Sequence, residues 1–268
     1  MARLLIAGYG FLGEALKCEF ITAGWEVVTL SRGEGQDVCC DLTILSEVMA
    51  IQGDYDLVIQ CAASGGGDEA AYRAIYLDAS RNLLKRFGGE KLIFVSSTSV
   101  YAQKDHTEVT EFSPAEPITA TGKILKQAED GVVANGGKVA RLSGLYGPGR
   151  CHILKAILNG RARLDSEGER VMNFVHRDDA ASALRLIAEQ PRENSIYNVS
   201  AGSVSQRDCY QSLADHFSLP LPPSSQSDAP RKRGNSSKSV SCSLMQSMGW
   251  EPRYPSFLSM ALACSMDK

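Results

Sequence analysis

The chain has 268 residues and carries 28 Lys and Arg against 31 Asp and Glu, which gives a net charge of -3. A chain of this length can bury a large core and is long enough for one main domain with a smaller lobe. The charges are mixed along the chain without long runs of one sign, which argues against a nucleic-acid-binding or membrane-binding surface.

Nothing in the sequence indicates export or membrane insertion. The opening residues MARLLIAGYG contain an apolar run that is too short for a signal peptide, and no other run approaches the ~20 apolar residues of a membrane helix. The eight cysteines form no CxxC pair and have no metal-ligand spacing with the four histidines. We therefore expect a cytoplasmic protein with reduced thiols and no metal site.

Short apolar runs alternate with amphipathic stretches from the N-terminus to about residue 143. The runs predict strands at 3–7, 25–31, 57–61, 91–96 and 138–143, and the stretches between them predict helices at 11–23, 43–51, 68–87 and 122–135. Alternation of this kind predicts an α/β fold, a doubly wound parallel sheet, over residues 1–147. We expect residues 170–200 to pack back on this domain, and residues 148–169 and 201–268 to form a small lobe that covers a substrate.

A glycine motif, GYGFLG, follows the first predicted strand and opens the first predicted helix. Gly8 permits a tight turn, Gly10 lets the backbone approach a pyrophosphate, and Gly13 lets helix and strand pack closely. The N–H groups of Phe11 and Leu12 at the helix start would face the negative charge. This context predicts a Rossmann-type site for NAD or NADP, whereas the alternative is an ordinary tight turn.

The second strand ends at Ser31-Arg32, where an NAD site usually carries an acidic residue for the ribose 2′-hydroxyl. A serine and an arginine there favour the 2′-phosphate of NADP, although a solvated turn arginine is the alternative. Asp41 and Leu42 are expected to flank the adenine. The residues Cys61, Ala62 and Ala63 follow the third long strand. Because their side chains are small, they are expected to leave room for the phosphates and ribose of the cofactor.

Four further motifs stand in order along the chain: QCAA at 60–63, SSTSVY at 96–101, RLSGLYGPG at 141–149 and NFVHRDD at 173–179. With the glycine motif, they make the sequence resemble the extended and atypical short-chain dehydrogenases/reductases, the group of NAD-dependent epimerases/dehydratases. The resemblance implies a catalytic hydroxyl after the fourth long strand, which here is Ser97. It also implies a Tyr followed four residues later by a Lys.

The alignment places Lys123 at the family's lysine position, where it would also bind the nicotinamide ribose, and Thr119 at the tyrosine position. An alkyl hydroxyl is too weak an acid to replace a phenol, and a positioned acid–base group is worth ~10²–10⁴ in rate. Tyr101 and His176 are the alternative proton donors, with Tyr146 behind them. Each of these three is more typical of a packing or structural residue.

Arg150 and the cluster Arg231-Lys232-Arg233 are candidates to contact an anionic substrate together with Tyr146 and His176, while solvated loop charge is the alternative for the cluster. We expect an NAD(P)-dependent oxidoreductase or epimerase/dehydratase-like protein, monomeric or homodimeric, that acts on a small polar substrate such as a nucleotide sugar. The competing hypothesis is a non-enzymatic NAD(P)-binding regulatory or sensor protein.

Overall fold

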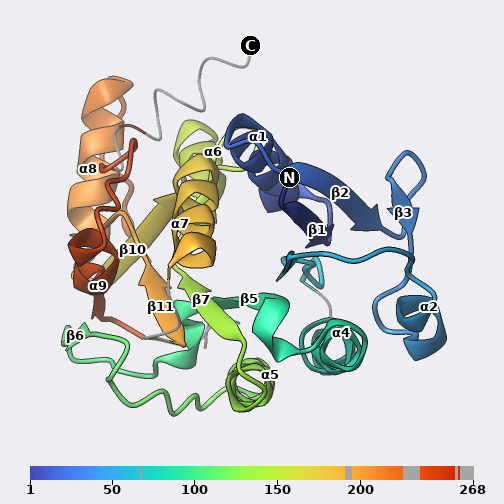
Figure 1. Cartoon of the computed structure of the whole chain (residues 1–268). Coiled ribbons are helices and arrows are strands. Elements are labelled where there is room, and N and C mark those ends of the chain that lie inside the picture. Colours follow the sequence, from blue (N-terminus) through green and yellow to red (C-terminus); the bar gives the residue numbers. More distant parts are fainter. Residues whose placement is uncertain (67, 191–194, 226–235, 257–258, 260–268) are drawn as a thin grey trace.

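Seven parallel strands form the central sheet of the computed structural model, which describes residues 1–66, 68–190, 195–225, 236–256 and 259 (Figure 1). Their order is β11-β7-β5-β4-β1-β2-β3. The chain runs outward from β1 in both directions, so the order reverses between β1 and β4, which is where ligands bind in such sheets. The strands are β1 (Arg3–Ala7), β2 (Glu26–Ser31), β3 (Val38–Cys39), β4 (Leu57–Gln60), β5 (Leu92–Ser97), β7 (Lys138–Leu142) and β11 (Ile196–Val199).

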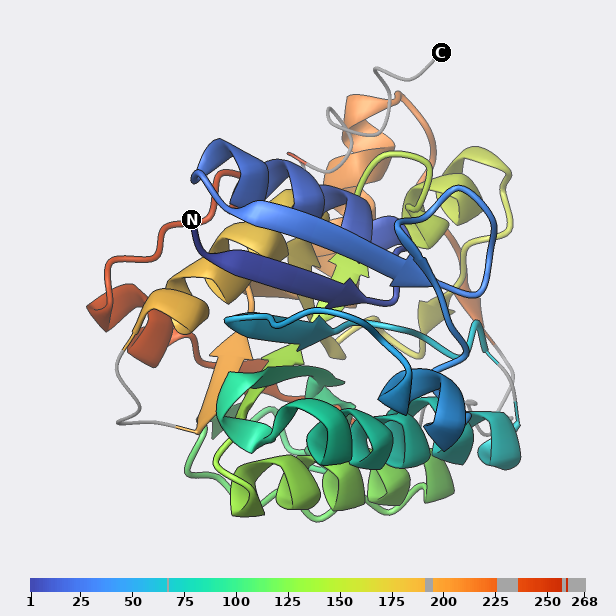
Figure 2. The same ribbon diagram turned by 45° about the vertical axis from the view of Figure 1, so that its right-hand side comes forward.

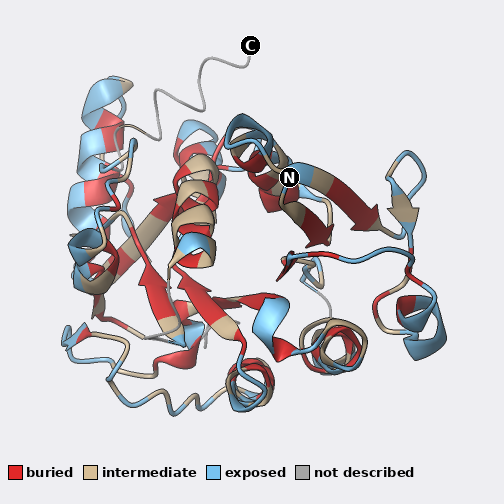
Figure 3. Cartoon of the chain, viewed as in Figure 1, coloured by how far each residue is buried: buried red, intermediate tan, exposed pale blue. Residues whose placement is uncertain are grey.

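Helices cover both faces of this sheet (Figure 2). Successive residues of a strand point to opposite faces, so β1 sends Leu4 and Ile6 into one apolar cluster and Leu5 into the other. The first cluster also contains buried residues of α1 (Phe11–Thr22) and α7 (Arg177–Glu189). The second contains residues of α2 (Leu45–Met49), α4 (Ala79–Phe87) and α5 (Ala120–Ala134). Figure 3 shows the buried strands between half-exposed helices.

The segment before α4 is one continuous helical stretch with a change of hydrogen-bond pattern. It consists of α3 (Glu69–Tyr72) followed by a π-helical segment η1 (Arg73–Asp78) that leads directly into α4. Such π-helical turns are rare and often lie at functional sites. Two short 3₁₀ turns flank β5, namely η2 (Gly89–Lys91) and η3 (Thr98–Val100).

A smaller lobe has its own apolar core, which includes Leu154, Ile157, Met172 and Leu213. Its elements are α6 (His152–Leu158), α8 (Gln206–His216), a three-stranded sheet of β12 (Gly202–Ser205), β10 (Val171–His176) and β8 (Gly144–Tyr146), and the pair β9 (Leu164–Asp165) and β13 (Ser224–Ser225). The pair β14 (Ser239–Val240) and β6 (Glu108–Val109) follows, and then α9 (Ser243–Ser247).

Helix α9 and the residues after it pack on the main domain, whereas the sequence predicted them in the lobe. Met245 and Trp250 are buried in the same cluster as α7, on the main sheet rather than in the lobe. Two large apolar side chains cannot be left on the surface of a lobe without cost, and burying each fully is worth about 1.5–3 kcal/mol. Residues 243–250 therefore belong structurally to the main domain.

A buried ion pair fixes α5 against the sheet. Arg141 of β7 and Glu129 of α5 are both buried, with 2.6 Å between Nη2 and Oε2. Ser96 of β5 donates to the same carboxylate at 2.6 Å, and Arg141 Nη1 donates to the Tyr101 hydroxyl at 2.8 Å. These hydrogen bonds fix the orientation of α5 on the sheet, and so determine which of its residues face the carboxyl end of β5.

The α/β fold class and the five long strands predicted from the sequence are confirmed, with ends within about two residues. The seven cysteines that lie in the described residues are free thiols. No helix in the described parts of the chain is long and apolar enough to cross a membrane.

Candidate active site

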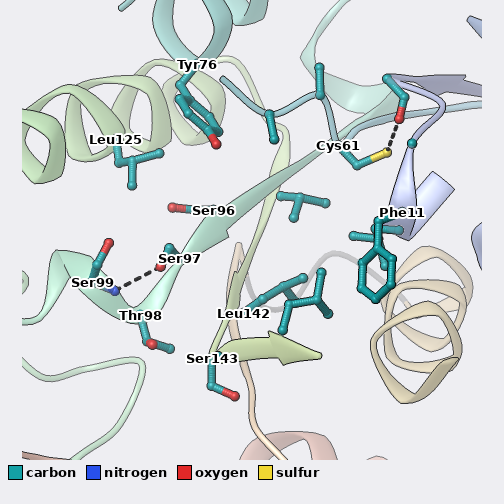
Figure 4. A pocket seen from close by; sticks show the side chains of 18 of the residues that line it. Phe11, Cys61, Tyr76, Ser96, Ser97, Thr98, Ser99, Leu125, Leu142 and Ser143 are labelled. Carbon is teal, nitrogen blue, oxygen red and sulfur yellow. Dashed lines mark hydrogen bonds between the residues drawn. The ribbon is translucent and has the colours of Figure 1, made fainter. Parts of the chain in front are cut away.

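A cleft of about 760 Å³ lies at the carboxyl ends of β1, β2, β4, β5 and β7 and continues to β10 of the lobe (Figure 4). Pockets of 300–1,000 Å³ typically hold cofactors and small substrates. Its lining begins at the glycine turn and the end of β2, passes the ends of β4, β5 and β7, and finishes at Arg170–Phe174, Ser236 and Lys238. One groove therefore joins the predicted cofactor site to the lobe.

The glycine turn has the features that a pyrophosphate requires. Gly8 has φ +114°, and a Cβ there would come within 2.2 Å of the Ala62 backbone nitrogen. A Cβ on Gly13 would lie 3.0 Å from the Gly8 carbonyl oxygen, so helix and strand approach closely. Gly10 lines the cleft and has no atom within 4 Å of its would-be Cβ. The open space beside Gly10 and the unused N–H groups at Phe11 and Leu12 fit a phosphate.

At the end of β2, Ser31 and the exposed Arg32 both line the cleft. Ser31 Oγ accepts a hydrogen bond from the Gly33 N–H at 3.1 Å. Asp41 and Leu42 line the same end, but Asp41 Oδ1 already accepts from Thr43 N and Oγ1 at 2.9 and 2.7 Å. The carboxylate that is nearest to an NAD-type position is thus engaged with its own turn.

Cys61, Ala62 and Ala63 line the middle of the cleft, directly after β4. The Cys61 thiol donates to the Gly8 carbonyl oxygen at 3.2 Å (Figure 4). Burial raises the pKa of this thiol to about 12, so it is protonated and unreactive at neutral pH. The structure thus places the three small residues in the cleft, where they leave room for a ligand beside the glycine turn.

Ser97 is the last residue of β5 and lies in the cleft, where its Oγ accepts from Ser99 N at 3.2 Å (Figure 4). This hydrogen bond caps the η3 turn and orients the hydroxyl. The hydroxyl proton remains available to a ligand oxygen, because the contact with Ser99 uses the oxygen only as an acceptor.

Helix α5 presents a different pair of residues from the predicted one. Thr119 lines the cleft, but it is the N-cap of α5, and its hydroxyl accepts from Gly122 N at 3.1 Å. Lys123 is exposed and is absent from the cleft lining. The residues one helical turn apart that do line the cleft are Thr121 and Leu125. The structure therefore does not bring Lys123 into the cleft that Ser97 lines.

Tyr101 is buried behind the cleft rather than in it. Its hydroxyl lies 2.9 Å from both the Thr110 carbonyl oxygen and Asn198 Oδ1 and accepts from Arg141. Burial raises the pKa of this phenol. The predicted alternative donor is therefore enclosed in a hydrogen-bonded network that links β7, β11 and the loop after β6.

Tyr146 and His176 also lie outside the cleft lining, and both are buried. His176 is the N-cap of α7: its Nδ1 accepts from Asp178 N at 3.3 Å, and its ring packs on Tyr146 and Tyr254. Burial lowers the pKa of His176, so the ring is neutral at pH 7. The structure does not bring either residue to a substrate.

Two cationic side chains, Arg170 and Lys238, lie at the lobe end of the cleft, and a third, Arg150, lies near the glycine turn. Arg150 lines the cleft and its guanidinium stacks 5.1 Å from the centre of the Phe11 ring, next to the glycine turn. Arg170 pairs with Asp165 at 2.8 Å, and Lys238 is buried. Among the residues described for the cleft lining, the one acid is Asp41, at the far end. The cluster Arg231-Lys232-Arg233 lies outside the described residues.

Comparisons with known proteins agree with this geometry. Residues 4–200 match the model of the NAD dependent epimerase/dehydratase family. The chain is 30% identical to the Escherichia coli protein YeeZ, covering 98% of this chain and all of that protein. The chain belongs to the NAD-dependent epimerase/dehydratase family.

Solved structures with the same fold extend over the whole chain. A Methylobacillus flagellatus protein described as an NAD-dependent epimerase/dehydratase has a TM-score of 0.81 and 25% identity, over 100% of this chain and 99% of its own. MoeE5, solved with UDP-glucose and NAD, has a TM-score of 0.80 and 20% identity, over 98% and 97%. The second similarity concerns the fold alone.

The residues through which α5 lines the cleft carry neither a phenol nor an ammonium group. The positions one turn apart that face the cleft hold Thr121 and Leu125, whereas Lys123 and Lys126 of the same helix do not line it. Phenols reach the cleft from other elements, namely Tyr9, Tyr72 and Tyr76. In Figure 4 the Tyr76 side chain extends toward β5, with its hydroxyl pointing into the cleft on the side away from Leu125.

Tyr76 is a residue that the sequence reasoning missed. It lies in the π-helical segment η1, half-buried, with its ring 4.5 Å from that of Tyr72 and edge-on to Phe94 at 6.4 Å. The available signal was the pair Tyr72 and Tyr76, which are four residues apart on a predicted helix after the third long strand and so share a face.

Proposed function

We propose that this protein binds NAD(P) in the cleft and acts as an oxidoreductase or epimerase on a small anionic molecule held at the lobe end. The observation that carries the proposal is the single continuous groove from the glycine turn, past Ser97, to the cationic residues of the lobe. The Gly8–Leu12 turn would hold the pyrophosphate and Arg32 the adenosine phosphate. The bound nicotinamide would accept or supply hydride.

The residues of the chain can perform the remaining chemistry without Lys123 or Tyr101. Ser97 would donate a hydrogen bond to the reacting oxygen of the substrate and so position it. Tyr76 would give its phenolic proton to that oxygen in the reducing direction, or take it back in the oxidising direction, in the place where α5 offers only Thr121. This assignment rests on the cleft position and the direction of the Tyr76 hydroxyl.

The test is turnover by the wild-type protein, Tyr76→Phe and Thr121→Ala, with a panel of nucleotide sugars and sugar phosphates and with NAD and NADP. Loss of a general acid should lower kcat by about 10²–10⁴ in Tyr76→Phe while dinucleotide affinity stays unchanged. Equal turnover by Tyr76→Phe and wild type would remove Tyr76 from the mechanism.

A second candidate function is supported by the same α5 residues. A protein with threonine and leucine at these positions has lost the usual acid–base pair, as a non-enzymatic dinucleotide-binding sensor would. Tight dinucleotide binding without turnover of any panel member would favour this function over the enzymatic one.

A further inference from the structure

Lys238 is a buried lysine in the wall of the cleft. It is 5% exposed and lies just before β14, next to the strand β10 that forms the lobe end of the lining. The Asn173 side chain of β10 donates to the Lys238 carbonyl oxygen at 2.8 Å and so fixes its backbone. The position of this ammonium group is therefore built into the fold rather than left to a flexible surface side chain.

The ammonium group has only neutral partners. Nζ donates to the Tyr101 carbonyl oxygen at 3.0 Å and to Ser236 Oγ at 3.1 Å. Within the described residues no carboxylate forms an ion pair with it. An ammonium group has three donors, so one N–H is left for a ligand in the cleft. A buried cation without a counter-charge is expensive, and such a cost is recovered when a ligand supplies the charge.

The neighbouring titratable groups do not supply that charge. Arg170, at the start of β10, is itself cationic and is paired with Asp165. His106 hydrogen-bonds to Ser237, the residue before Lys238, at 3.3 Å. Glu108, on the adjacent β6, is exposed, and the Tyr101 phenol is turned into its own network with Arg141.

We propose that Lys238 is the residue that binds the anionic group of the substrate, a phosphate or a carboxylate, at the lobe end of the cleft. The proposal rests on the proposed function in that the ligand is the substrate of the same groove. Recognition of the substrate is thereby assigned to a residue that lies outside both the glycine motif and the carboxyl ends of the main sheet. Met172 and Phe174, which line the groove beside it, would contact the uncharged part of the ligand.

The experiment measures binding of glucose 1-phosphate and of glucuronate by calorimetry, with neutral glucose as the control ligand. The protein is loaded with whichever dinucleotide binds more tightly, so that the sugar phosphate cannot occupy the pyrophosphate site. Wild type is compared with Lys238→Met, Lys238→Arg and, as a matched control, Lys85→Met on the exposed face of α4. Circular dichroism establishes that each variant is folded.

At pH 7 at least one charged sugar should bind wild type and Lys85→Met, and binding to Lys238→Met should be at least tenfold weaker. Burial lowers the pKa of Lys238 to about 8, so raising the pH from 7 to 9 should weaken wild-type binding about tenfold, because the bound form is the ammonium. Lys238→Arg keeps its charge throughout this range and should bind equally at both pH values. A purely structural lysine would not produce this difference.

The wild-type pH profile needs no variant, so the proposal stays testable if Lys238→Met does not fold. Equal affinities of wild type and a folded Lys238→Met would overturn the proposal. So would wild-type binding of both charged sugars no better than of glucose. If no dinucleotide binds wild type, the proposed function fails instead, and the sugar titrations of the unloaded protein still decide the role of Lys238.

Discussion

At the level of single residues, Ser31 and Arg32 are the candidates for distinguishing NAD from NADP, because both line the cleft at the end of β2. Two carboxylates near the end of β2 are already engaged, because Asp41 is held by Thr43 and the Asp37 carboxylate accepts from Thr29 N and Oγ1 at 2.8 and 2.7 Å. The cationic Arg32 at the cleft edge would repel nothing in NAD and would attract the additional phosphate of NADP. We therefore infer a preference for NADP.

Arg32→Ala should weaken NADP binding by about 1.5–3 kcal/mol, the range for a hydrogen bond to a charged group, and should leave NAD binding nearly unchanged. Calorimetric titration of both dinucleotides checks this, with Glu34→Ala in the same exposed turn as the control. An equal loss for both dinucleotides would mean that Arg32 stacks on the adenine and does not read the phosphate.

The sequence predicted the residues whose role depends on local backbone geometry, and missed those whose role depends on distant packing. Gly8, Gly10 and Gly13 could be assigned because a strand, a turn and a helix adjoin them. Lys238 follows a Ser/Pro-rich stretch with no periodic pattern. Its burial arises from contacts with β10 and with the backbone of Tyr101, more than 130 positions earlier in the chain.

Helix α5 is the element where the prediction and the structure differ most. Spacing alone placed Thr119 and Lys123 on one face, which is correct for any pair four residues apart. Which face meets the cleft depends on how the Glu129–Arg141 pair and the N-cap at Thr119 seat the helix on the sheet. The apolar pattern indicates which face of the helix packs on the sheet but not which end of that face borders the cleft, so Thr121 and Leu125 could not be identified.

Restoring an acid–base pair at these two positions is a test of the helix assignment. Thr121→Tyr combined with Leu125→Lys should raise any slow turnover, at most by the ~10²–10⁴ of a general acid. The matched variant is Thr119→Tyr beside the native Lys123, which should give no gain and should cost about 1 kcal/mol of stability through the lost N-cap. Turnover assays and thermal unfolding of both proteins check this. A gain confined to Thr119→Tyr would contradict the assignment.

At the scale of the whole molecule, the buried Glu129–Arg141 pair joins α5 to the sheet below the cleft. Glu129→Ala would leave the Arg141 guanidinium buried without its counter-charge, which typically costs 3–5 kcal/mol. The control is Asp130→Ala, whose exposed pairing with Lys126 is worth at most about 1 kcal/mol. Urea unfolding measures both losses, and equal losses would show that the pair does not hold the helix.

The layered fold was predictable because alternating strands and helices leave few arrangements of a parallel sheet. The return of residues 243–250 to the main domain was not, since a short helix and one tryptophan carry no signal for the surface on which they pack. The cleft was predictable only in part. Its floor is formed by the ends of the predicted strands, whereas its far wall is formed by the lobe and the segment around Lys238.

The central claim is that the cleft binds a dinucleotide through the glycine turn, and the most direct test is calorimetric titration of wild type and Gly10→Glu with NAD and NADP. A glutamate at position 10 would fill the open space beside the turn and repel the pyrophosphate. Wild type should bind at least one dinucleotide, and the folded variant should bind neither. Equal affinities of the two proteins, or no binding by folded wild type, would contradict the claim.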